Sequence, residues 1–99
     1  MKKQPEPKKK DNPRNPNAIQ SKIKALALKR GVGSTFCPSE AARALEEDER
    51  IWRRLMPLVR REAVKMAQNG EIVITRKGKI QDPFDDIRGV IRLGLPPEN

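Results

Sequence analysis

Basic side chains that could bind a polyanion are concentrated in one predicted helix, residues 49–69. At about 100° per residue, one side of this helix carries an apolar stripe, formed by Trp52, Met56, Val59, Ala63 and Met66. The other side carries Arg53, Arg54, Arg60, Arg61, Lys65 and Gln68. Arginine can donate paired hydrogen bonds to a guanine edge or contact the flanking phosphates. The spacing therefore predicts a helix that packs on one side and binds nucleic acid on the other, the alternative being an ordinary solvated face.

Within this set, we expect Arg60, Arg61 and Lys65 to enter or border a major groove. Arg54 is predicted to contact phosphates, and Arg53 belongs to the same nucleic-acid-binding face. Trp52 could in principle stack on an unpaired base, but its place on the apolar stripe favours a role in the core.

Two further basic segments lie outside this helix. Arg76, Lys77 and Lys79 follow the β-branched stretch 71–75, where a wing would leave a sheet and meet a sugar-phosphate backbone. Three more lysines, Lys8, Lys9 and Lys10, stand in a proline-rich segment, residues 1–16. That segment has too few apolar residues to offset the entropy of ordering, so we predict a disordered basic tail. Its lysines are either a nonspecific polyanion contact or a solubilising leader.

The residue types needed for most catalytic and metal sites are missing. The chain has no histidine and one cysteine, Cys37, which excludes the usual zinc sites and the Cys-His and Ser-His-Asp arrangements. Gly31-Val32-Gly33 lacks the lysine of a phosphate-binding loop. Three aspartates, Asp82, Asp85 and Asp86, lack the spacing of a Ca²⁺ loop. We therefore expect no enzyme, no metal, no cofactor and no small-molecule substrate.

Composition limits the remaining possibilities. The 99 residues carry a net charge of +9 with 35% hydrophobic and 35% charged residues, which allows one small core. A positive field of this size attracts nucleic acid or an anionic surface. No apolar run resembles a signal peptide or a membrane span, and a single cysteine suits a reducing compartment, so we expect a cytoplasmic protein without a membrane partner.

The predicted elements follow one another as helix, short strand, helix, helix, strand, turn and strand. Their ranges are 16–30, 35–36, 38–45, 49–69, 71–75, 76–79 and 90–93. Asn15 is a suitable cap for the first helix, and Gly31 can end it. Pro57 either kinks the third helix or follows a short turn, with a main helix that starts near Pro57. The unbroken phase of the stripe favours a kinked or closely abutting arrangement.

This order predicts an α+β winged helix-turn-helix, with three helices and a small antiparallel hairpin or three-stranded sheet. The domain is expected at residues 17–95, with the basic tail at 1–16 and a short C-terminal tail at 96–99.

Four segments together resemble a small bacterial family, domain of unknown function 3253. They are CPSEAARAL at 37–45, WRRLMPLVR at 52–60, GEIVITRKG at 70–78 and IRL at 91–93. The likeness covers roughly residues 18–95 and implies a winged-helix fold in a bacterial cytoplasm, but no activity and no site residues. Val90 stands where the family pattern has proline, and Gly94-Leu95 where it has a basic stretch.

Two functions from different classes agree with these observations. The first is nucleic-acid binding, with duplex DNA as the ligand and RNA as a further possibility. The second is a protein-interaction module that uses the same winged-helix surface to dock an acidic protein, motivated by the acidic residues near the wing.

Overall fold

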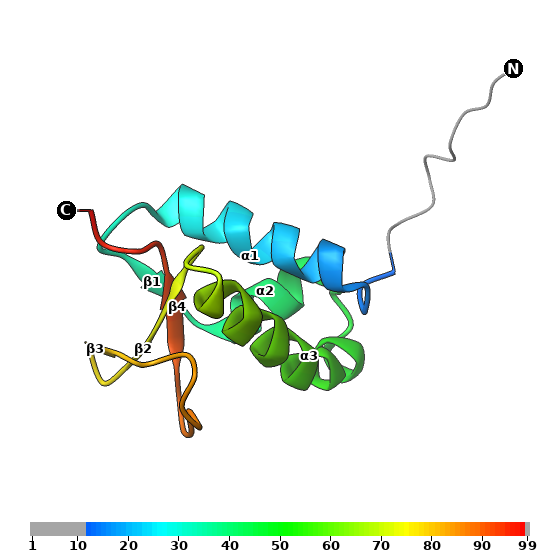
Figure 1. Ribbon diagram of the computed structural model, residues 1–99. Coiled ribbons are helices and arrows are strands. Elements are labelled where there is room, and N and C mark those ends of the chain that lie inside the picture. The colour runs from blue at the N-terminus through cyan, green and yellow to red at the C-terminus, as the bar shows by residue number, and fades with distance from the viewer. Residues whose placement is uncertain (1–11, 99) are drawn as a thin grey trace, which may run out of the picture.

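The computed structural model describes residues 12–98 and has an α+β fold of three helices and four short strands. The helices are α1 (Pro16–Arg30), α2 (Pro38–Leu45) and α3 (Glu49–Gln68). The strands are β1 (Thr35–Phe36), β2 (Val73–Arg76), β3 (Lys79–Ile80) and β4 (Arg92–Gly94). Figure 1 shows the helices gathered on one side, with the sheet at the end where α3 finishes. α1 begins one residue before the predicted start of the domain.

The helix boundaries follow from local capping chemistry. The side chain of Asn15 accepts a hydrogen bond from the backbone N–H of Asn17 at 2.7 Å, and Gly31 ends α1 with a φ of 82°. Asp48 caps α3 in the same way, accepting from the N–H of Arg50 at 2.9 Å. α3 continues through Pro57, so residues 49–68 form one helix. The prediction of a single phase across the proline is confirmed.

The four strands form one antiparallel sheet in the order β1-β4-β2-β3. Ile74 of β2 and Phe36 of β1 both pair with Leu93 of β4, and all three side chains are buried. The predicted antiparallel pairing of the segments near 71–75 and 90–93 is therefore confirmed, with shifted bounds.

One strand, β3, was absent from the prediction of a hairpin or three-stranded sheet. β3 pairs with β2 through a two-residue turn, Lys77-Gly78, in which both residues have positive φ, 54° and 81°. This is the backbone form of a type I′ turn, whose twist matches that of the flanking strands. The hairpin partner of β2 is thus β3, while β4 lies on its other side.

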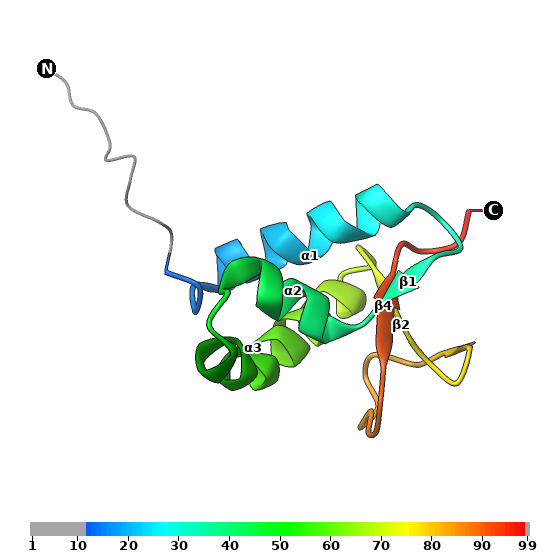
Figure 2. The same ribbon diagram turned by 180° about the vertical axis from the view of Figure 1, so that it is seen from behind.

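The hydrophobic core lies between the three helices and the inner face of the sheet. Its fully buried side chains include Ile19 and Ile23 of α1, Phe36 of β1, and Leu55 and Val59 of α3. α1 packs along α3 on the side away from the loop that follows β3, as Figures 1 and 2 show.

The buried side of α3 is rotated relative to the predicted stripe. Val59, Ala63 and Met66 are buried as expected, but Trp52 and Met56 are only partly buried and pack against the edge of the core. Leu55 and Glu62 are buried in addition. Among the helices in residues 12–98, none combines the length and the apolar character needed to cross a bilayer.

Candidate nucleic-acid interface

The exposed side of α3 presents a row of cations, here called the basic face. Its members are Arg50, Arg53, Arg54, Arg61 and Lys65, all exposed. Arg50 was not among the predicted contacts, although its wheel position lies close to that of Arg54. α1 and α2 both pack against α3, and the five cations remain exposed.

At its N-terminal end the basic face is paired with nearby carboxylates. Arg53 donates from Nε to Glu49 at 2.7 Å, and Arg50 lies 3.6 Å from Asp48. Both arginines stay well exposed, so the pairs are worth little in stability and can exchange for another anion. Within residues 12–98, Arg54 has neither an ion pair nor a side-chain hydrogen bond.

Arg53 also contacts Trp52. Its guanidinium carbon lies 5.1 Å from the centre of the indole ring, and that of Arg43 lies 5.6 Å from it. Such distances are typical of cation–π contacts, which orient the guanidinium groups beside a half-buried ring. Trp52 therefore acts as a platform for two arginines at the edge of the core.

The C-terminal half of the basic face rests on a buried acid, Glu62, which the sequence analysis did not consider. Glu62 is 0% exposed. Gln20 of α1 donates from Nε2 to Glu62 Oε1 at 2.7 Å, Arg61 donates from Nε to Oε2 at 3.3 Å, and Lys65 Nζ lies 3.5 Å from Oε2. Burial acts to raise the pKa of Glu62, but the Gln20 and Arg61 hydrogen bonds and the Lys65 charge hold that pKa below its ordinary value. Glu62 is therefore a carboxylate at neutral pH.

Arg60 contacts a loop instead of standing free on the helix surface. Its two terminal nitrogens donate to the carbonyls of Ile87 at 2.9 Å and Gly89 at 3.0 Å. Gln68, two turns further along α3, donates to the carbonyl of Pro83 at 3.0 Å. These bonds fasten residues 81–91, here called the acidic loop, along one flank of α3.

The acidic loop carries the three aspartates whose role the sequence left open. Asp82 accepts from the N–H of Phe84 at 2.9 Å, and Asp86 pairs with Arg88 at 2.8 Å. All three are exposed, as is Phe84, of which 74% is accessible. In the part of the chain that the structure describes, no three His, Cys, Asp or Glu residues gather as a metal site would require.

The β2–β3 turn places a second group of cations at the end of the sheet. Arg76, Lys77 and Lys79 are exposed, and none of them has a carboxylate partner within residues 12–98. Lys77 stands in the two-residue turn, Arg76 and Lys79 pair at the ends of the flanking strands, and the guanidinium of Arg76 lies beside Gly89. The predicted contacts Lys8, Lys9 and Lys10 lie outside the described residues.

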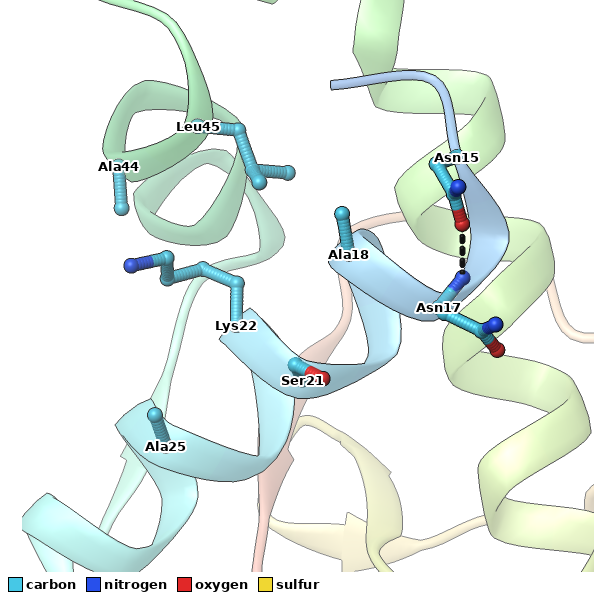
Figure 3. A pocket seen from close by; sticks show the side chains of 8 residues that line it. All are labelled: Asn15, Asn17, Ala18, Ser21, Lys22, Ala25, Ala44 and Leu45. Carbon is cyan, nitrogen blue, oxygen red and sulfur yellow. Dashed lines mark hydrogen bonds between the residues drawn. The ribbon is translucent and has the colours of Figure 1, made fainter. Parts of the chain in front are cut away.

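A shallow hollow elsewhere on the surface offers no comparable chemistry. It lies between the N-terminal half of α1 and the end of α2 (Figure 3). It is lined by Asn15, Asn17, Ala18, Ser21, Lys22, Ala25, Ala44 and Leu45. The lining is mostly small side chains, and it holds no acid or base that could work with Lys22. The hollow is therefore no active site of a familiar kind.

Comparison with known proteins gives a family but no activity. No curated protein matches the chain. A family match covers residues 16–96, which include all three helices and all four strands described above. The chain therefore belongs to the family described as "Protein of unknown function (DUF3253)".

Proposed function

We propose that this chain is a winged-helix protein that binds double-stranded nucleic acid, duplex DNA in the first place, and that it is a binding protein rather than an enzyme. The order of elements supports this proposal, because α2 and α3 follow each other as in a helix-turn-helix and β2 leads into a hairpin beside them. In this arrangement α3 is the recognition helix and the β2–β3 turn is part of the wing. A single cysteine suits a cytoplasmic setting.

The observation that carries the proposal is the set of cations without carboxylate partners. Arg54 on α3 and Arg76, Lys77 and Lys79 on the β2–β3 turn have no internal ion pair, within residues 12–98, to break before they bind phosphate. Neutralising phosphates releases condensed counterions, which supplies most of the affinity for a duplex. Arg61 and Lys65, each about half exposed, extend the same surface.

The experiment is fluorescence anisotropy with a labelled mixed-sequence DNA duplex between about 50 and 200 mM salt. The triple variant R54Q/K77Q/K79Q should bind about tenfold or more weakly, with a salt slope flatter by about 0.9 for each phosphate that is no longer neutralised. The matched control R14Q/K22Q/K29Q removes the same charge from the α1 side and should change affinity much less. Absence of wild-type binding at low salt, or an equal weakening in both triple variants, would contradict the proposal.

A second function, docking of an acidic protein on the same face, is favoured by exposed apolar side chains beside α3. Phe84 is 74% and Val90 is 82% exposed, and both belong to the acidic loop that Arg60 and Gln68 fasten to α3. In this case F84S/V90S would abolish recovery of one discrete partner at high salt after nuclease treatment. Under the first proposal the same variant would leave the salt-dependent binding of duplex DNA intact. Competition with an RNA duplex shows which nucleic acid the protein prefers.

A further inference from the structure

The acid beneath the basic face is shared by two of the cations that would contact phosphate. Arg61 Nε and Lys65 Nζ lie 3.3 and 3.5 Å from the same oxygen, Glu62 Oε2. The other oxygen, Oε1, accepts from Gln20 at 2.7 Å and ties α3 to α1. The two oxygens of this buried carboxylate thus bind different groups, Oε1 the side chain of Gln20 and Oε2 the cations Arg61 and Lys65.

The burial of Glu62 makes its charge more effective than that of an exposed acid on α3. Glu62 is 0% exposed, whereas the side chain of Glu49 is 62% exposed. Salt and water screen an exposed charge strongly, but they screen a buried one much less. Glu62 therefore opposes the positive potential around Arg61 and Lys65 at every salt concentration.

We infer that Glu62 is an affinity-determining residue, which holds Arg61 and Lys65 partly neutralised and so weakens the binding of phosphates to the basic face. This inference rests on the proposed function. A phosphate that approaches these two cations must compete with a carboxylate already in place. Arg54, about two turns before Arg61 on α3, has no such competitor within the described residues.

A purely structural role would give the opposite result on substitution. If Glu62 served only to position the two cations, its removal would disorder them and weaken binding. If it neutralises them, E62Q strengthens binding, because the glutamine side chain keeps an oxygen for Gln20 while the opposing charge is gone. The sign of the change in affinity separates the two roles.

The test compares full-length wild type, E62Q and E71Q by anisotropy on the same labelled duplex at several salt concentrations. E62Q should bind about three- to tenfold more tightly, with a salt slope steeper by about 0.9. E71Q removes the same charge from Glu71, whose partner is Lys24 of α1 at 3.8 Å, and should change affinity less than about twofold. E62M, with an apolar side chain of similar length, is the second variant if E62Q folds poorly, and it should also bind more tightly.

Three outcomes overturn the inference, and they differ from one another. Wild-type binding with a steep salt dependence, combined with unchanged or weaker binding by E62Q and E62M, overturns the role of Glu62 alone. No binding by the wild type at any salt overturns the proposed function, and the role of Glu62 with it. A gain in affinity that E71Q reproduces assigns the effect to net charge and likewise contradicts the inference.

Discussion

α3 and the β2–β3 turn both carry several cations, but within residues 12–98 those on α3, apart from Arg54, have partners inside the fold, whereas those on the turn have no carboxylate partner. On α3, Arg53 pairs with an acid of its own helix, Arg60 with backbone carbonyls, and Arg61 with a buried acid. On the turn, Arg76, Lys77 and Lys79 have no carboxylate partner within residues 12–98. The number of basic residues in a segment therefore does not measure how much charge it can offer to a ligand.

The largest effect that would sharpen this comparison is expected at Arg60. Replacing Arg60 with alanine removes both bonds to the acidic loop and should lower the free energy of unfolding by about 1–3 kcal/mol. K79Q, on the turn, should stay within about 0.5 kcal/mol of wild type, as exposed substitutions usually do. Urea unfolding followed by circular dichroism measures both. Equal stability of R60A and K79Q would show that the bonds of Arg60 to the acidic loop do not stabilise the fold, and that Arg60 does not differ from Lys79 in this respect.

The sequence predicted elements whose signals are local. The cap Asn15, the stop Gly31 and the helical period of residues 49–68 each act within a few residues, and the helices that they predict are present, although the buried side of α3 is rotated. The partners of Arg60 are different in kind, because Ile87 and Gly89 lie 27 and 29 residues further along the chain. A helical wheel of α3 contains only the residues of α3, so it could not show that Arg60 binds a distant loop.

Two other features left signals that could have been used. Glu62 follows Leu55 by seven residues and Val59 by three, which places it on the buried side of α3 once that side is centred correctly. The apolar stripe alone places the centre of the buried side of α3 too close to Trp52. β3 is only two residues long and has no periodicity, but the pair Lys77-Gly78 resembles the two-residue hairpin loops that favour glycine in second place.

A smaller effect is expected at low pH, where it tests Glu62, the buried partner of Arg61 on α3. The pKa of Glu62 is lowered in the folded state from an ordinary value of 4.5. A lowered pKa means that the ionised carboxylate stabilises the fold above about pH 4.5, and that this contribution disappears as the pH falls through the folded-state pKa. Between neutral pH and about pH 3, the melting temperature of wild type should therefore fall more than that of E62Q.

The control for the acid experiment is E49Q, because the carboxylate of Glu49 is largely exposed. Its melting temperature should follow that of wild type more closely over the same range. Parallel curves for wild type and E62Q would show that the buried carboxylate is not the group that responds.

The smallest expected effect is at Lys77, where local conformation and charge act in opposite directions. Lys77 has a φ of 54°, a region that asparagine and glycine enter more easily than lysine. K77N should therefore raise the free energy of unfolding by a few tenths of a kcal/mol while it weakens duplex binding about two- to threefold. K77R keeps the charge and should leave the affinity close to wild type. Weaker binding by K77N in a more stable protein would show that this position sacrifices stability for an available cation. If K77N binds as tightly as wild type, Lys77 does not contact the duplex.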